Sequence, residues 1–150
     1  MPQFSKRKVA ETTKSASFAF NYVAPTSLAH AQLTGGIVFS DLAFALTGST
    51  GCRVDITKLI WSLPISAISA TGPGIAVNWD SPGGATFGHV LYGVGETDFK
   101  ALGFPLANPF TGANRINSIS FSSLGEVATN QGLSIFIEIS KTLGFGFTGA

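Results

Sequence analysis

The chain has 150 residues, enough for about one domain, and 45% of them are hydrophobic, as in an ordinary globular protein. Charged residues make up only 11% of the chain, against about 25% in typical soluble domains. The net charge of +1 gives no overall field to attract nucleic acid, and the single cysteine, Cys52, excludes an intrachain disulfide. A surface with so little charge is typical of a subunit that other copies or partners cover.

The first 14 residues concentrate positive charge. They hold four basic residues and one acidic residue, a net charge of +3, whereas residues 15–150 hold five basic and seven acidic residues, a net charge of −2. We predict an extended basic arm over 1–14 whose cations are candidate partner contacts: Lys6, Arg7, Lys8 and Lys14. The alternative is a disordered terminus that its charge keeps soluble. Three adjacent cations without interleaved aromatic residues predict no specific nucleic-acid binding.

Neither a targeting segment nor a membrane span is predicted. Polar residues follow the basic cluster where a signal peptide would have its apolar region, so we expect a product that stays in the cytoplasm where it is made. Two long stretches lack charged residues, at 15–40 and 59–79, but proline and glycine interrupt both.

Strand signals begin after the arm. Aromatic and small residues alternate from 15 onward until Pro25 ends the pattern, as expected of a strand. We predict a short strand at 37–39 and either one helical turn or more strand at 41–46, because periodicity does not resolve short apolar runs. Residues 48–51 indicate a turn.

A further strand is predicted over 53–63, with apolar residues on both faces near its C-terminal end. One face is marked by Val54, Ile56 and Ile60, and the other by Leu59 and Trp61. Apolar residues on both faces are expected where a strand of a sandwich passes from an exposed region to a covered one. A Ser/Ala/Gly-rich linker over 66–73 and an alternating strand over 75–79 follow.

The second half of the chain continues in the same way. A Pro-Gly-Gly turn precedes a predicted strand at 86–94, and residues 96–114 are predicted to form a long loop. The runs 116–121 and 133–139 predict closing strands, the second in strict alternation of apolar and other residues.

These signals favour one all-β domain over residues 15–141, a jelly-roll-like β-sandwich of six to eight antiparallel strands. No repeat at a fixed period points to a solenoid or a propeller. Residues 142–150 form a Gly/Phe-rich C-terminal tail, in which Phe145 and Phe147 are candidate partner contacts. Exposed phenylalanine on a loose tail is unfavourable, so we expect the two to dock on their own subunit or on a neighbour.

Residues able to do chemistry are scattered. His30 and His89 lack nearby ligands in the sequence, so structural roles are expected rather than metal binding. Cys52 has no histidine placed to activate it. The acids best placed for a hydrolytic pair or a calcium site are Asp80, Glu96 and Asp98, although loop carboxylates usually cap turns or face water. We predict no catalytic residue, no metal and no cofactor.

Three aromatic residues support an alternative function. Trp61, Trp79 and Tyr92 are candidate stacking platforms for a glycan, which would make the chain a carbohydrate-binding or adhesin-like module. The competing interpretation, which we favour for the tryptophans, is core packing, because both lie in apolar strand contexts.

Several short segments together resemble a family of small virion proteins of short-tailed marine bacteriophages. The segments are 58–62 (KLIWS), 76–80 (AVNWD), 91–93 (LYG), the loop through Phe104, Asn108 and Gly112, and 134–139 (SIFIEI). The resemblance covers roughly residues 53–141, and the N-terminal third matches less clearly.

The resemblance implies a non-enzymatic β-domain on the phage particle, a capsid decoration or cement protein or a component of the tail or head fibres. The implied partners are other copies of the chain, with a trimer favoured, and the major capsid protein or another virion protein. The implied location is the virion, assembled in the host cytoplasm, without membrane association.

Overall fold

The computed structural model describes residues 4–23, 30–31, 34–63, 74–124, 127–128 and 132–147. Its strands are β1 (Ser5–Glu11), β2 (Ser15–Val23), β3 (His30–Ala31), β4 (Thr34–Ile37), β5 (Arg53–Ser62), β6 (Gly74–Ser81), β7 (Gly84–Leu91), β8 (Val94–Asp98), β9 (Ile119–Leu124), β10 (Val127–Ala128) and β11 (Gly132–Leu143). Single 3₁₀ turns occur at η1 (Phe39–Asp41), η2 (Ser49–Gly51) and η3 (Gly112–Asn114). Within these ranges no helix is long and apolar enough to cross a membrane.

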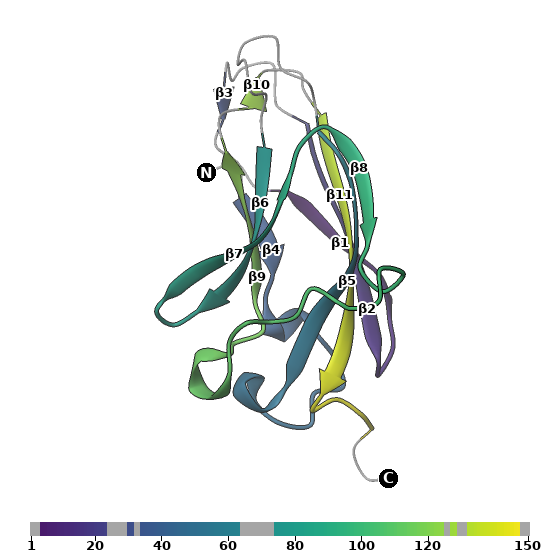
Figure 1. Cartoon of the computed structure of the whole chain (residues 1–150), viewed down its shortest axis with the longest axis vertical. Coiled ribbons are helices and arrows are strands. Elements are labelled where there is room, and N and C mark those ends of the chain that lie inside the picture. The colour runs from purple at the N-terminus through teal and green to yellow at the C-terminus, as the bar shows by residue number, and fades with distance from the viewer. Residues whose placement is uncertain are drawn as a thin grey trace.

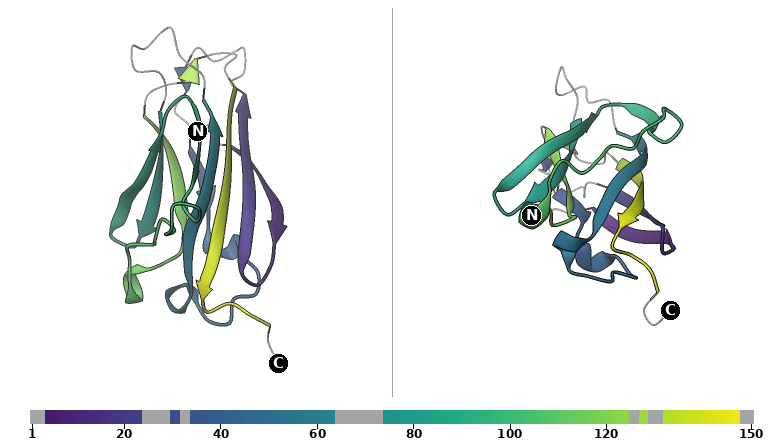
Figure 2. Two further views of the ribbon diagram at one scale, coloured as in Figure 1. Left: turned by 45° about the vertical axis from the view of Figure 1, so that its right-hand side comes forward. Right: turned by 60° about the horizontal axis from the view of Figure 1, so that its bottom comes forward.

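Two antiparallel sheets pack face to face (Figures 1 and 2). The strand order is β1-β2-β11-β5-β8 in one sheet and β4-β9-β6-β7 in the other, and β3 pairs with β10 in a short ribbon. Strands of the first half pair in reverse order with strands of the second: β2 with β11, β4 with β9, β5 with β8 and β6 with β7. The chain is therefore one long hairpin, folded back between β6 and β7 and then rolled up. This is jelly-roll topology, so the predicted β-sandwich is confirmed.

The core lies between the sheets and follows the predicted alternation. Phe18 and Phe20 of β2 are each 1% exposed, and Trp79 of β6 is equally buried. On β11 the inward positions are Leu133, Ile135, Ile137 and Ile139, all at most 3% exposed. Phe4 closes one side of the core, because its ring packs edge-on against Phe20 and its N–H donates to the carbonyl oxygen of Thr34.

β5 contains a β-bulge at Thr57, which corrects the predicted faces of this strand. Its pairing with β11 shifts by one residue there. The extra residue reverses the alternation, so that Ile56 and Leu59 are both fully buried whereas Ile60 is 38% exposed. Ile60 therefore lies on the outer face of the sheet, and Trp61 packs against the core with Leu59.

The single strand predicted at 86–94 is two strands in different sheets. β7 ends at Leu91, and Gly93, with φ +62°, redirects the chain into β8. β8 then pairs with β5 and occupies the start of the predicted loop at 96–114.

The N-terminal segment is not an extended arm. Residues 5–11 form β1, an edge strand paired with β2 (Figure 2). All of its residues except Glu11 are exposed, and β1 is the outermost strand of its sheet. Lysine side chains on an edge strand prevent it from pairing with strands of other molecules. This role explains why the sequence of β1 is basic and lacks the alternation of apolar and polar residues.

The segment predicted as a short strand or helical turn is mostly irregular. β4 ends at Ile37, η1 covers 39–41, and the residues up to η2 adopt neither helix nor regular strand apart from one bridge between Ala45 and Phe145. The predicted linker over 66–73 lies outside the described residues.

Candidate assembly surfaces

A buried lysine near the C-terminal end of β11 ties three segments together. The side chain of Lys141 is 0% exposed, and its Nζ lies 2.7 Å from Oε2 of Glu11. The ammonium also donates to the carbonyl oxygens of Thr12, at 2.8 Å, and Ala43, at 3.0 Å. It lies 5.1 Å from the ring centroid of Phe145. All three of its donor hydrogens therefore have acceptors on the β1–β2 turn and the segment before η2.

The electrostatics of this cluster favour the ionised form of Glu11. Burial acts to raise the pKa of Glu11, but hydrogen bonds from Lys141, from Lys8 and from the N–H of Ala43 outweigh it and hold the pKa below its ordinary value of 4.5. The carboxylate thus remains charged beside the buried ammonium at neutral pH.

The C-terminal segment docks on its own chain. Gly144, with φ +82°, crosses so closely over Cys52 that a Cβ there would lie 2.6 Å from the carbonyl oxygen of Gly51. The N–H of Leu46 donates to the carbonyl oxygen of Gly144, and the N–H of Gly146 donates to that of Phe44. Residues 144–146 therefore pack on their own chain, and contact of Phe147 with a neighbour stays a prediction.

This docking creates an exposed apolar surface, which we call the basal patch: Phe44, Leu46 and Phe147. Their exposed fractions are 37%, 48% and 70%. The rings of Phe44 and Phe147 pack edge-on with centroids 5.4 Å apart, and Leu46 lies beside Gly146. Of the two predicted contacts, Phe147 is on this surface, whereas Phe145 is partly buried against the core.

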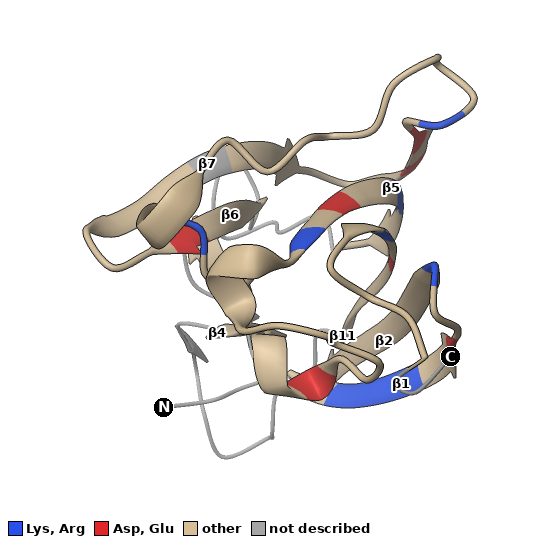
Figure 3. Cartoon of the chain, turned by 90° about the horizontal axis from the view of Figure 1, so that it is seen from below, with Lys and Arg blue, Asp and Glu red and all other residues tan. Residues whose placement is uncertain are grey.

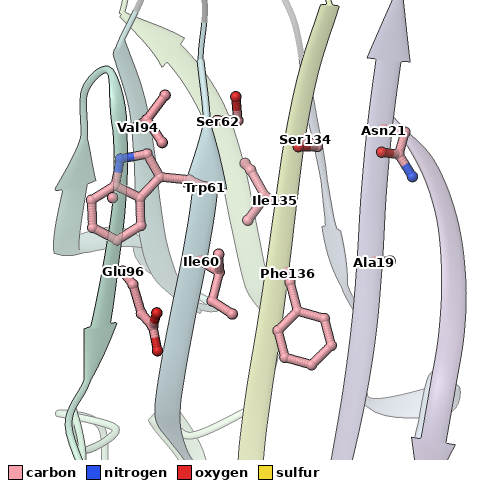
Figure 4. Close-up of a pocket in the computed structure, with 11 residues that line it drawn as sticks. Ala19, Asn21, Ile60, Trp61, Ser62, Val94, Glu96, Ser134, Ile135 and Phe136 are labelled. Carbon is pink, nitrogen blue, oxygen red and sulfur yellow. The ribbon is translucent and has the colours of Figure 1, made fainter.

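A second apolar feature is a hollow of about 490 Å³ on the outer face of the five-stranded sheet (Figure 4). Strand register explains it. One row across the sheet places Glu96, Ile60, Phe136 and Ala19 side by side, and the next places Val94, Ser62, Ser134 and Asn21. The two serines are small and leave a depression that Ile60, Phe136 and Val94 border.

A third feature is the turn that follows β8, which we call the β8 turn: residues 99–104. It carries two strongly exposed apolar side chains, Leu102 at 65% and Phe104 at 67%. Lys100 in this turn and Lys14 of the β1–β2 turn border a second hollow of about 400 Å³.

The predicted basic contacts divide into two kinds. Lys6 pairs with Asp41 at 2.6 Å, and Lys8 pairs with Glu11 at 2.7 Å, so both are used within the chain. Arg7 and Lys14 form no ion pair with any described residue. Figure 3, which views the molecule from below, shows the basic stretch of β1 beside the acidic residue of η1, with the other charged positions scattered over β5 and the rest of the chain.

The predicted glycan platforms do not form one surface. Trp79 is 1% exposed and belongs to the core. The indole of Trp61 folds over Gly95, where an added Cβ would lie 2.5 Å from Cζ2, and its N–H donates to the carbonyl oxygen of Tyr92 at 2.9 Å. Tyr92 is 53% exposed, with its ring against Gly74. The structure therefore brings Trp61 close to Tyr92 but leaves Trp79 apart.

The candidate acids have separate structural partners. Asp80 accepts a hydrogen bond from Ser120, Glu96 pairs with Lys58 at 3.3 Å, and Asp98 caps the N–H of Ala101. No three of the described His, Cys, Asp and Glu side chains gather where they could hold a metal ion.

The two histidines and the cysteine were the remaining candidates for chemistry, and the two whose side chains are described pack against other parts of the fold. His89 packs edge-on against Trp61 and Phe99, while the side chain of His30 lies outside the described part of the chain. Cys52 is fully buried, and its thiol donates to the carbonyl oxygen of Gly144.

No family model and no curated protein matches the chain. A cupin-domain protein from Bordetella pertussis Tohama I matches with 10% identity and a TM-score of 0.33, over 94% of this chain and 95% of that one. A structure of Desmodium yellow mottle tymovirus matches with 10% identity and a TM-score of 0.31, over 94% of each chain. Similarity this low carries no functional argument, and strand order alone identifies the jelly roll.

Proposed function

We propose that the chain is a non-enzymatic structural subunit of a bacteriophage particle, a decoration or cement protein that binds the capsid shell through the basal patch. The observation that carries this proposal is an ordered apolar surface, Phe44, Leu46 and Phe147, at the end of a weakly charged jelly roll. Buried hydrogen bonds and an ion pair hold this surface in place while its side chains remain in water. Such a surface is typical of a protein interaction site.

The position of the basal patch suits a lattice contact. The patch lies where the C-terminal segment docks, and Figure 1 shows the C-terminus at one end of the elongated sandwich, so most of both sheets is left for contact with neighbouring subunits. Each such contact is modest, but repetition over a shell multiplies the resistance to internal pressure through multivalency. The interior between the sheets is filled with large apolar side chains, which suits a structural role.

The proposal is tested on phage particles produced by a genome that encodes this chain. Peptide mapping of gradient-purified particles should find the chain in many copies. The double variant Leu46→Ser with Phe147→Ser should lower its occupancy on particles by about tenfold or more, because two apolar side chains lose their buried contact. The matched control is Val90→Ser, on an exposed position of β7 far along the chain from the patch.

Two results would overturn parts of this proposal, and a folding control accompanies them. Circular dichroism must show that both variants remain folded. Absence of the wild-type chain from purified particles would overturn the virion assignment. Normal occupancy of the double variant would overturn the basal patch as the capsid contact.

A further inference from the structure

The β8 turn is hydrogen-bonded within itself and anchored in the core. Phe99, 7% exposed, is its buried end, and the N–H of Phe99 donates to the carbonyl oxygen of Thr57. The N–H groups of Leu102 and Phe104 donate to the carbonyl oxygens of Asp98 and Phe99, and Oδ1 of Asp98 accepts from the N–H of Ala101. The turn thus holds Leu102 and Phe104 in water on a fixed backbone.

The sheet hollow offers apolar surface to such side chains. Apolar side chains form part of its rim, with Ile60 and Val94 exposed at 38% and 79% and Phe136 beside them (Figure 4). Its volume of about 490 Å³ is large enough for the tip of an apolar turn. The chain's own β8 turn leaves the sheet beyond the other end of β8, so it does not fill the hollow of the same copy.

Charge makes the two features complementary as well. Glu96 is the charged residue that borders the hollow. Its carboxylate pairs with Lys58 at 3.3 Å but is 55% exposed, so it remains open to a second cation. Lys100 lies in the β8 turn and has no ion-pair partner among the described side chains. A turn entering the hollow therefore carries a cation toward the carboxylate at its rim.

From this complementarity, we infer that the occupant of the hollow is a second copy of this chain, which inserts the exposed Leu102 and Phe104 of its β8 turn and places Lys100 facing Glu96. The inference rests on the proposed function and names its contact between neighbouring subunits. Reciprocal insertion produces a two-fold dimer, and one-way insertion produces a ring when the rotation closes. This contact is separate from the basal patch, which leaves the patch free for the shell.

The test is sedimentation velocity of the purified full chain over a range of concentrations. The wild type should associate, and Phe104→Ser should weaken association by about tenfold or more. Each single charge reversal, Lys100→Glu or Glu96→Lys, should weaken association by about fivefold, and the double reversal should restore it. Val38→Ser, a matched change at another exposed apolar position, should leave association unchanged.

Restoration by the double reversal supports direct contact between the two residues, since a change in folding would not be reversed by a second charge change. A wild type that remains monomeric at all concentrations overturns the inference. So does an assembly that is indifferent to Phe104→Ser and to both single reversals. Neither result decides the capsid role, which is read separately from the presence of the chain on purified particles.

Discussion

Nζ of Lys141 and Oε2 of Glu11 lie 2.7 Å apart, although 130 positions separate the two residues in the chain. Their side chains are 0% and 9% exposed. Burying two charges costs more than their attraction returns unless further hydrogen bonds complete the site. Here carbonyl oxygens and the N–H of Ala43 complete it. The pair therefore fixes the β1–β2 turn and the segment carrying Phe44 against β11, and so positions the basal patch.

Removing the anion of this pair should be strongly destabilising. Glu11→Gln leaves the Lys141 ammonium buried without a counter-charge, so we expect the free energy of unfolding to fall by about 3 kcal/mol. Urea denaturation at pH 7, followed by circular dichroism, measures this. Lys8→Met removes the 39% exposed partner of the same carboxylate and should cost at most about 1 kcal/mol. Equal losses in the two variants would contradict the role assigned to the buried partner.

The same pair should make stability depend on acid. The pKa of Glu11 is lower in the folded chain than its ordinary value of 4.5, so the unfolded chain takes up a proton first as the pH falls. The stabilisation from Glu11 is therefore complete above about pH 4.5 and is lost as the pH falls through the lower folded pKa. Thermal denaturation from pH 7 to pH 3 should show a smaller decline for Glu11→Gln than for the wild type. A decline of the same size would exclude Glu11 as a source of the acid sensitivity.

Sequence periodicity predicted the interior of this fold well. Apolar alternation on β2 and β11 identified the residues that face the core, because a strand with one buried face must repeat every two residues. The same alternation places Lys141 in line with Ile137 and Ile139, an inward position at which a lysine signals a buried ion pair. Its partner Glu11 could not be identified, because pairing across 130 positions depends on the roll of the whole chain.

The sequence-based predictions that the structure corrects, the faces of β5 and the N-terminal arm, failed for local physical reasons. The bulge at Thr57 inserts one residue and reverses the faces of β5, and nothing in residue type marks it. β1 lacks alternation because both of its faces meet solvent, so it resembles a disordered basic terminus. The hollow, likewise, depends on which residues of four strands share a row across the sheet, and register is not visible in one sequence.

Asn117 should be critical for the loop that joins η3 to β9. It is fully buried, has φ +55°, accepts hydrogen bonds from the N–H of Val54 and from Asn108, and donates to the carbonyl oxygen of Cys52. Asn117→Ala should lower the free energy of unfolding by about 3 kcal/mol, because buried polar groups lose their partners.

Two further variants separate the causes of that loss. Asn117→Gly removes the same hydrogen bonds but accepts the left-handed backbone, so it should be less destabilising than Asn117→Ala by about 1 kcal/mol. Asn114→Ala, at an exposed position in η3, should have little effect. Thermal denaturation measures all three. If Asn117→Ala were as mild as Asn114→Ala, the buried network would have no stabilising role.

Gly95 should control the position of the Trp61 indole. A methyl group at Gly95 would lie 2.5 Å from Cζ2 and 2.9 Å from Cε2 of Trp61, so Gly95→Ala must displace the ring and break its hydrogen bond to Tyr92. We expect a loss of about 1–3 kcal/mol in stability from overpacking. Acrylamide quenching of tryptophan fluorescence should increase, because Trp61 becomes more exposed while Trp79 remains in the core.

The matched control for this change is Gly48→Ala. No heavy atom lies within 4 Å of a Cβ placed there, and the backbone φ of −68° suits any residue. Stability and quenching should therefore match the wild type. A Trp61→Phe variant removes the responsive signal and should abolish the difference in quenching between the glycine and alanine forms at position 95. If acrylamide quenched the tryptophan fluorescence of Gly95→Ala no more than that of the wild type, the result would contradict this prediction. The absence of a side chain at position 95 would then not determine the position of the Trp61 indole.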